Sequence, residues 1–391
     1  MKILFITSYY YPNMLGGTEH SVKLLAEGLK ERGHEVFVIS SDKKDKETEI
    51  INGVHVYRFN LKYRSELISW KIIRKAFEFR NYFIKNKLEE LLDHIKPDII
   101  HTNSLFYLSP IVWKIANKRG IKVVHTLRDY WGICPKCTLL KKDNTICTNK
   151  NILCKLHQLN YESYAKYVDY VTAPSEFTLK KYKEHKVYID TPGKMVSNAI
   201  DFDVKAHSEI VKMRNERNDQ IVNYLFIGSL ETFKGIEYLI EAFKNVKLDN
   251  IRLNICGVGK LTDHVKELIK DDNRIQYLGR VDNEDKEKIL LMSDVMIVPS
   301  IWYEPFGRVV IEGYKYAMPV IGTDIGGISE LLDNSVSIGV SPGVHEELEK
   351  AIIKLSDRSE IKKYLNNFSK TFDKYKLSKQ LCDFEEIYKN I

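Results

Sequence analysis

The stretch Glu304-Pro305-Phe306-Gly307-Arg308-Val309-Val310-Ile311-Glu312 carries the strongest pattern in this 391-residue sequence. It holds two carboxylates eight positions apart, with Pro-Phe-Gly directly after the first. The apolar run 296–298 predicts a short buried strand before it, and the apolar spacing from 307 to 317 predicts a helix after it. Glu304 then lies on the loop between strand and helix, and Glu312 about two turns into the helix. In an open α/β sheet such a loop lies at the carboxyl edge, where a helix N-terminus attracts anions.

This placement favours a ligand that is anionic at one point and rich in hydroxyl groups at another. The helix N-terminus would hold the anionic part through its free N–H groups and its dipole. A carboxylate would accept hydrogen bonds from the hydroxyl groups. A nucleotide-sugar fits this description. The alternative is a surface helix with two ordinary glutamates, which the motif on its own would favour.

Length and composition indicate a soluble protein of two domains. A chain of 391 residues exceeds one compact core, and 44% apolar with 29% charged residues is ordinary for a globular protein. No apolar run reaches the roughly 18–20 residues of a membrane span. Residues 1–7 predict a first β-strand and not a signal peptide. We therefore expect a cytoplasmic protein with reduced thiols.

Charge is distributed unevenly along the chain. Residues 1–200 hold 33 Lys and Arg against 21 Asp and Glu, whereas residues 201–391 hold 27 against 32. A basic N-terminal half suggests nucleic acid, anionic lipid or a phosphorylated acceptor as partner, or only a solvated Lys-rich surface. The stretch 65–94 interleaves basic and aromatic residues. It predicts either a helix that lies on an anionic membrane surface or a helix that packs on the sheet and exposes its basic face to solvent.

Strand and helix patterns alternate through both halves of the chain. The first half opens with a strand, a loop that contains Gly16-Gly17, and a helix, but it lacks the spacing of a dinucleotide site. The breaker-rich stretch 190–193 predicts a linker. We expect an α/β protein of two Rossmann-like domains, each with a doubly wound parallel sheet, that face each other across a cleft. The predicted domains are 1–190, with an insertion at 132–155 and a final helix 376–391 packed back on it, and 200–374.

The insertion contains four cysteines, Cys134, Cys137, Cys147 and Cys154. A C-x2-C start and two further cysteines could bind Zn²⁺ tetrahedrally and fix a loop that has little core of its own. The gaps of nine and six residues are not a standard finger spacing. Free thiols, or cysteines packed as small apolar groups, are the alternatives.

Several pieces together resemble the retaining glycosyltransferases of family 4, which have the GT-B fold. The resemblance covers essentially the whole chain, and the E-x7-E motif with the later Gly-Gly pair is its specific part. The matching stretches are 304–312 with the E-x7-E motif, 317–321 and 326–330 after it, Gly228 with Lys234-Gly235 in the phosphate-contacting stretch, 16–19 in the N-terminal glycine loop, and 197–201 as the inter-domain strand.

The resemblance implies a role for each end of the opening motif. Glu304 would bind sugar hydroxyls and stabilise a cationic sugar ring, and Glu312 would bind the ribose hydroxyls. Departure of a nucleoside diphosphate builds negative charge, which needs fixed positive groups such as Lys234. The family usually has an Arg where this chain has Ser229. We expect Arg308, or the backbone N–H groups of residues 306 and 307, to take over part of that task.

A second departure from the family lies after the strand expected at 121–126. The family often has a His, thought to contact the donor sugar, where this chain has Arg128 before Asp129. An arginine donates hydrogen bonds but cannot act as a neutral base. This agrees with a retaining mechanism in which the leaving phosphate oxygen takes the proton of the acceptor. The implied catalytic residues are Glu304, Lys234, Arg128 and Asp129, and the implied substrate contacts are Gly16, Gly17, Gly228, Ser229, Lys234, Arg280, Glu304, Phe306, Gly307, Arg308, Val309 and Glu312.

These observations predict a retaining hexosyltransferase that moves a sugar from a UDP- or GDP-hexose to a glycan or lipid-linked acceptor. Cell-surface polysaccharide or glycolipid biosynthesis is the expected setting, in the cytoplasm or at the inner face of the membrane. No cofactor is required for the reaction, a structural zinc is an open prediction, and no nucleic acid is expected as a partner. The alternatives are a non-catalytic subunit that binds nucleotide-sugars, and a GT-B epimerase that acts on them.

Overall fold

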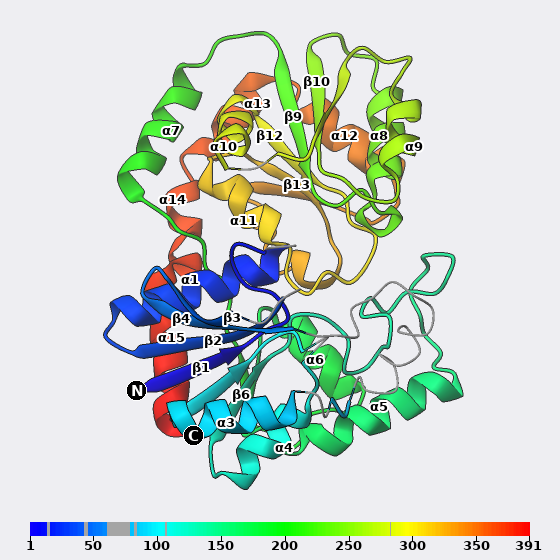
Figure 1. The fold of residues 1–391 in the computed structure, drawn as a ribbon. Coiled ribbons are helices and arrows are strands. Elements are labelled where there is room, and N and C mark those ends of the chain that lie inside the picture. Colours follow the sequence, from blue (N-terminus) through cyan, green and yellow to red (C-terminus); the bar gives the residue numbers. More distant parts are fainter. Residues whose placement is uncertain (14–15, 43–45, 61–78, 82–83, 106–107, 282) are drawn as a thin grey trace. The chain divides into compact units, whose positions relative to one another are not determined.

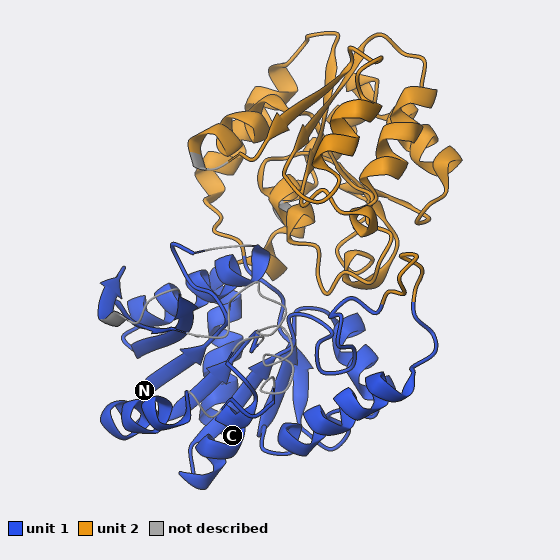
Figure 2. Ribbon diagram, turned by 45° about the vertical axis from the view of Figure 1, so that its right-hand side comes forward, with its two compact units in different colours: residues 1–139, 147–199, 377–391 blue, residues 140–146, 200–376 orange. Residues whose placement is uncertain are grey.

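The computed structural model describes residues 1–391 apart from 14–15, 43–45, 61–78, 82–83, 106–107 and 282. The chain forms two compact units, drawn in blue and orange in Figure 2. Unit 1 contains residues 1–139, 147–199 and 377–391, and unit 2 contains residues 140–146 and 200–376. Most of the helix predicted over 65–94, including its tryptophan, lies outside the described residues.

Unit 1 is built on an eight-stranded sheet with the order β3-β4-β2-β1-β5-β6-β7-β8. All neighbours are parallel except β3 and β4, which pair in antiparallel fashion. The apolar residues 3–6 of β1 are buried on both faces of the sheet, as a central parallel strand requires. The strands are β1 (Lys2–Ile6), β2 (Glu35–Asp42), β3 (Lys46–Ile51), β4 (Val54–Asn60), β5 (Ile99–Thr102), β6 (Lys122–Thr126), β7 (Tyr170–Ala173) and β8 (Gly193–Met195).

Helices cover both faces of this sheet (Figure 1). The last helix of the chain belongs to unit 1, where Leu381 and Phe384 are buried in its core. Leu381 packs on Gly28 of the first helix so closely that an added Cβ at Gly28 would lie 2.9 Å from its Cδ1. The helices of unit 1 are α1 (Gly17–Glu31), α3 (Lys85–Ile95), α4 (Ile111–Lys118), α5 (Ile152–Ala165), α6 (Glu176–Glu184) and α15 (Leu377–Asn390).

Unit 2 is built on a six-stranded, wholly parallel sheet with the order β11-β10-β9-β12-β13-β14. The chain runs outward from β9 to β11, then returns to place β12 on the other side of β9. The strand order therefore reverses between β9 and β12, and in open α/β sheets ligands bind beyond the carboxyl ends of two such strands. The strands are β9 (Val222–Ile227), β10 (Ile251–Cys256), β11 (Ile275–Gly279), β12 (Val295–Val298), β13 (Val320–Thr323) and β14 (Ser337–Val340).

The helices of unit 2 bury apolar faces against this sheet, and one large hydrophobic cluster joins them. The stretch 197–201, predicted as a strand, is not one: it makes only an isolated bridge between Ile200 and Lys376. The helices are α7 (Val204–Glu216), α8 (Ile236–Asn245), α9 (Thr262–Leu268), α10 (Asn283–Met292), α11 (Arg308–Lys315), α12 (His345–Lys354), α13 (Arg358–Leu365) and α14 (Phe368–Thr371), with short 3-10 helices η1 (Thr232–Lys234), η2 (Gly326–Ile328) and η3 (Asp373–Tyr375).

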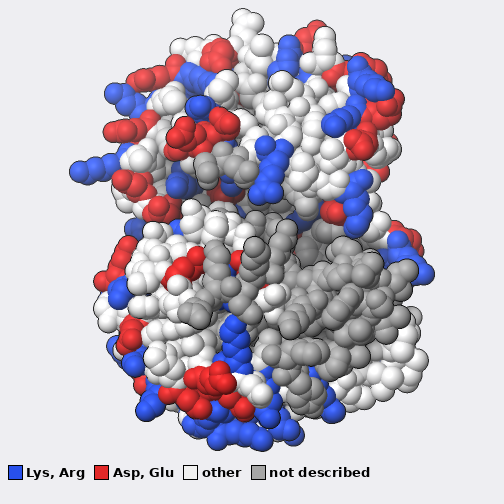
Figure 3. Space-filling view, in the orientation of Figure 1, with Lys and Arg blue, Asp and Glu red and all other residues white. Residues whose placement is uncertain are grey.

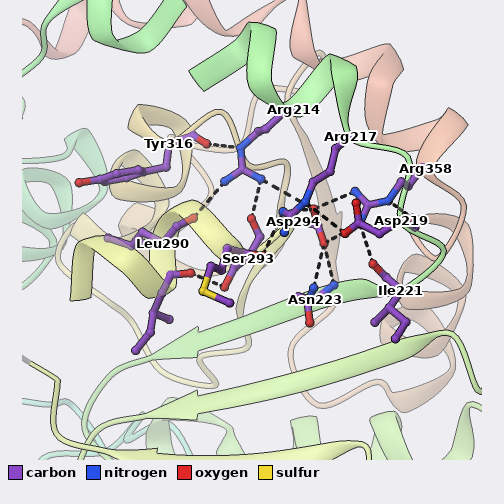
Figure 4. A network of polar contacts seen from close by, with 12 residues as sticks. Arg214, Arg217, Asp219, Ile221, Asn223, Leu290, Ser293, Asp294, Tyr316 and Arg358 are labelled. Atoms are coloured by element: carbon purple, nitrogen blue, oxygen red, sulfur yellow. Dashed lines mark hydrogen bonds and ion pairs between the residues drawn. The ribbon is translucent and has the colours of Figure 1, made fainter. Parts of the chain in front are cut away.

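A buried carboxylate, Asp294, ties four segments of unit 2 together (Figure 4). Its side chain is 2% exposed, and Arg217 Nη1 and Arg358 Nη1 each donate to its Oδ1 at 2.9 Å. The backbone N–H of Asn223 donates to its Oδ2 at 2.8 Å. Arg214, also buried, lies 3.9 Å from Asp294 and donates to three backbone carbonyl groups. The network fixes the end of α7 and the start of α13 to the sheet.

Among the described residues, no helix combines the length and the apolar character needed to cross a membrane. On the face drawn in Figure 3, acidic and basic side chains mix over unit 2, and Lys and Arg gather along the lower edge of unit 1.

Candidate active site

The two loops at the reversal point of the unit 2 sheet touch each other. The loop after β9 contains Gly228 and ends in Gly235, and the loop after β12 begins at Pro299. Gly235 has a φ of +73°, and an added Cβ would lie 1.9 Å from the carbonyl oxygen of Pro299. Only glycine permits this approach. It brings Lys234, the residue before Gly235, next to the loop that carries Glu304.

Lys234 and Glu304 form an ion pair at this point, through Nζ and Oε1. Ser300 Oγ also donates to Glu304 Oε1, at 3.1 Å. The indole ring of Trp302 lies 5.5 Å from Lys234 Nζ and stabilises the ammonium group by a cation–π contact. The side chain of Glu304 is 11% exposed and that of Lys234 is 24% exposed. An acid and a base, both partly shielded from water, therefore lie where the fold places a ligand.

The glycine pair at 326–327 supports the loop that carries Glu304. An added Cβ at Gly326 would lie 2.8 Å from the backbone nitrogen of Glu304, and one at Gly327 would lie 2.5 Å from the carbonyl oxygen of Pro305. The N–H of Gly327 donates to the carbonyl oxygen of Glu304 at 2.7 Å. Larger residues would push this loop away, so the pair positions Glu304.

Helix α11 begins directly after that loop. Gly307, with a φ of +94°, is its N-cap residue, and no side chain of the described residues caps this end of the helix. Arg308 is in the first turn, and burial lowers the pKa of its guanidinium while the nearby Glu312 opposes that effect. The N-terminus of α11 thus combines backbone N–H groups with a cation, as a site for phosphate would.

Glu312 is held from a neighbouring helix. Lys286 on α10 donates to both of its carboxylate oxygens, at 2.8 and 3.0 Å. Lys286 carries no local signal in the sequence, because it lies 26 positions away from Glu312 on another helix. Lys286 is a positioning residue for the Glu312 carboxylate.

The remaining unit 2 candidates differ in what they can offer. Phe306 is buried, and its ring packs edge-on against Tyr375, so only its backbone could contact a ligand. Val309 packs against the hydrophobic core. Ser229 and Arg280 are exposed on the loops after β9 and β11. Substrate contact by each of these residues stays a prediction.

Arg128 and Asp129 lie in unit 1, after β6. Arg128 Nε donates to Asn103 Oδ1 at 2.9 Å, and its Nη1 donates to Asn198 Oδ1. Asp129 accepts a hydrogen bond from the N–H of Trp131 at 2.7 Å, and burial raises the pKa of its carboxyl group. These side chains line one pocket with Asn103 and several aromatic rings. The two asparagines fix the orientation of the guanidinium, a role that the sequence analysis assigned to neither, although Asn198 lies in the matched stretch 197–201.

Two histidines near this pocket belong to the core of unit 1. His101 lies between Tyr388 Oη at 2.6 Å and Thr126 Oγ1 at 2.7 Å. Burial lowers the pKa of both histidines, that of His125 to about 3. Both side chains are therefore neutral near pH 7 and hold β5, β6 and α15 together.

The glycine loop of unit 1 starts α1. Gly16 is the N-cap residue, and its N–H donates to Glu19 Oε2 at 2.8 Å. Glu19 is buried and so closes the first turn from inside. Contact of Gly16 or Gly17 with a substrate stays a prediction.

All four cysteines of the insertion belong to unit 1, and among the described residues none of them forms a disulfide. Cys134 is buried and the other three are half-buried, and Cys147 Sγ donates to the carbonyl oxygen of Asn149 at 3.3 Å. Across the described residues, no three or more His, Cys, Asp or Glu side chains are grouped so that they could hold a metal. The zinc site stays a prediction.

Elemental analysis of the purified protein tests the zinc prediction. If the four cysteines bind zinc, about one equivalent should co-purify, and the variant Cys134→Ser, Cys137→Ser should lose it. Cys256→Ser is the control, because Cys256 is buried in unit 2 far from the insertion in sequence. Less than about a tenth of an equivalent in the unmodified protein would refute the site.

Comparison with known proteins identifies the class. Residues 15–204 match the family described as Glycosyltransferase Family 4, and residues 209–372 match the family Glycosyl transferases group 1. The chain belongs to these glycosyltransferases and has the GT-B fold of two parallel-sheet α/β domains, which confirms the predicted fold class and the predicted family.

Two relatives and two solved structures show which proteins this chain is similar to. An uncharacterized 42.6 kDa protein in the cps region of Klebsiella pneumoniae is 30% identical over 85% of this chain and 87% of its own. The O-antigen chain mannosyltransferase C of Escherichia coli is 23% identical over 98% of this chain and 96% of its own. Sucrose-phosphate synthase from Thermosynechococcus elongatus superimposes with a TM-score of 0.79 at 18% identity, over 99% and 98% of the chains. HepE of Anabaena, solved with UDP-glucose, superimposes with a TM-score of 0.69 at 17% identity, over the full length of both chains.

Proposed function

We propose that this glycosyltransferase is a retaining hexosyltransferase that uses a UDP- or GDP-hexose. Its acceptor would be a glycan or a lipid-linked sugar, in the synthesis of a cell-surface polysaccharide or glycolipid. The Lys234–Glu304 pair at the reversal point of the unit 2 sheet is the observation that carries the proposal. Relatives named for a cps region and for an O-antigen chain, and the neighbour solved with UDP-glucose, support the choice of donor and acceptor class.

The proposed reaction assigns charge stabilisation to unit 2. The bond between the anomeric carbon and the phosphate oxygen breaks, and the nucleoside diphosphate leaves with the electron pair. Lys234, Arg308 and the N–H groups at the start of α11 would stabilise the negative charge that develops. Glu304 would hold sugar hydroxyls and stabilise the cationic sugar ring, and Glu312 would hold the ribose.

The acceptor would attack from the face that the leaving group vacates, which retains the anomeric configuration. Its oxygen bonds to the anomeric carbon, and its proton passes to the leaving phosphate oxygen. No side chain is required as an obligatory base. Arg128, fixed by Asn103 and Asn198, and Asp129 would contact the donor sugar, as the resemblance implies. We also place the protein in the cytoplasm, at the inner face of the membrane.

A thermal-shift screen with nucleoside diphosphates and their hexoses tests the donor. A matching nucleotide-sugar should raise the melting temperature, since a ligand that binds only the folded state stabilises it. The sugar should then be released slowly with its anomeric configuration retained, as proton NMR of the first product would show. Inverted product would contradict the retaining mechanism. Tight donor binding without turnover over a wide acceptor panel would favour the non-catalytic subunit, and an epimerised nucleotide-sugar would favour the epimerase.

A further inference from the structure

Helix α5 presents a row of apolar side chains to solvent. Ile152, Leu153, Leu156 and Leu159 are 68, 70, 54 and 60% exposed. The spacing of four and three residues between 152, 156 and 159 places these side chains on one helix face. Among the described residues, no other helix exposes more than two large apolar side chains. Figure 1 shows α5 at the periphery of the elements that form unit 1.

The opposite face of α5 is firmly anchored, so the exposed row has a fixed orientation. His157 Nε2 donates to the carbonyl oxygen of Trp131 at 2.6 Å, and Tyr161 packs edge-on against Trp113 and Trp131 with centroids 5.5 Å away. At the start of the helix, Asn151 Oδ1 accepts from the N–H of Cys154 at 2.8 Å. The apolar row therefore belongs to an ordered helix and does not result from a frayed end.

Lysines border this row. Lys155 and Lys166 are exposed at the flank and at the end of α5. Gln158 Nε2 donates to the carbonyl oxygen of His185 at 2.6 Å. This contact places the segment around His185, with the exposed Lys183 and Lys186, beside α5.

Acidic groups nearby are fewer, and they are engaged. Glu162 accepts from Gln158 Nε2 at 2.6 Å, and Glu184 pairs with Lys181 at 2.8 Å. Over residues 101–200 the chain has 16 Lys and Arg against 7 Asp and Glu. With four exposed lysines against these two engaged carboxylates, the surroundings of the apolar row are positive.

We propose that α5 docks on an anionic lipid bilayer. Its four exposed apolar side chains enter the boundary between headgroups and acyl chains, and the bordering lysines contact lipid phosphates. The sequence had suggested the stretch 65–94 for this role, whereas the described residues provide such a surface on α5. The inference deepens the proposed function, on which it rests for its purpose, by naming the surface where a lipid-linked acceptor would be met.

Charge argues for lipid over a second copy of the chain. A two-fold interface through α5 would bring identical lysine borders together, which is unfavourable. Four side chains also fall short of the roughly 800 Å² per partner that a stable interface buries. An anionic membrane removes both difficulties, because it supplies negative charge and an apolar phase of unlimited extent.

Vesicle flotation of the full-length protein tests the proposal. The protein should float with vesicles of equal parts phosphatidylglycerol and phosphatidylcholine, and much less with phosphatidylcholine alone. The variant Leu153→Gln, Leu156→Gln should bind at least about tenfold more weakly, because two apolar side chains no longer enter the bilayer. The matched control is Met292→Gln, Ile353→Gln, two residues 66 and 50% exposed on helices of unit 2, and it should float like the unmodified protein.

The outcomes separate this inference from the proposed function. If the unmodified protein stays unbound, or the α5 variant floats equally well, the membrane surface is refuted. A dimer in light scattering that the α5 variant abolishes, without any flotation, would assign the row to a second copy instead. Donor hydrolysis without vesicles reports on the proposed function alone, and the α5 variant should retain it with an unchanged melting temperature.

Discussion

Replacing Glu304 with glutamine should lower the rate of sugar transfer by about two to three orders of magnitude, the loss typical when one charge-stabilising group is removed. Glutamine keeps the shape of the side chain and its contact with Ser300 but removes the negative charge. That charge would act on the cationic sugar ring, which exists only near the transition state, so kcat should fall more than donor affinity. Product release over time and a donor titration measure the two effects separately.

Lys234→Met provides the complementary variant. It should slow transfer and also weaken donor binding, because the ammonium group would contact phosphate both before and during the reaction. Since Lys234 and Glu304 form an ion pair, the losses in the double variant should not add. Glu346→Gln, an exposed carboxylate in the first turn of α12, is the control and should behave normally. Activity of Glu304→Gln within about fivefold of the unmodified enzyme would remove Glu304 from the catalytic residues.

The sequence predicted the fold well where burial leaves a continuous pattern. Strands such as β1 and β12 are buried on both faces, and their unbroken apolar runs are visible without a structure. The hairpin of β3 and β4 carries a weaker strand pattern, although Asn52-Gly53 is a strong two-residue turn signal. Both residues have positive φ, of +50° and +80°, as such a turn requires. Because most residues of β3 are polar, the strand lacks the alternation of apolar and polar residues that would predict it.

The site could be predicted only as far as single motifs allow. Glu304 and Lys234 are 70 positions apart, and they meet because β9 and β12 are neighbours in the sheet. Strand order is not written in any local stretch, so the resemblance supplied that pairing. The contacts that position Glu312 and Arg128, from Lys286 and from two asparagines, arise in the same way from tertiary packing. Residues of this kind give no periodicity, and a matched stretch such as 197–201 does not reveal which side chain its asparagine contacts.

Asp294→Ala should destabilise unit 2 by about 3–5 kcal/mol, the usual cost of removing one partner from a buried charge cluster. The carboxylate accepts from Arg217, Arg358 and the N–H of Asn223 and is 2% exposed, so water cannot replace it without opening the structure. The buried Arg214, 3.9 Å away, loses its counter-charge. Burial already lowers the pKa of the Arg214 guanidinium to about 10, because a buried site solvates a cation poorly.

Urea unfolding followed by tryptophan fluorescence measures this loss, with the transition of unit 2 assigned through Trp302. Asp263→Ala is the control: this side chain is 98% exposed in an i,i+3 pair with Lys266, and its removal should cost less than about 0.5 kcal/mol. Asp294→Asn should lie between the two, because an amide oxygen still accepts hydrogen bonds but carries no charge. If Asp294→Ala unfolds within about 1 kcal/mol of the unmodified protein, the three arginines are solvated without Asp294, and the network does not hold α7 and α13 to the sheet.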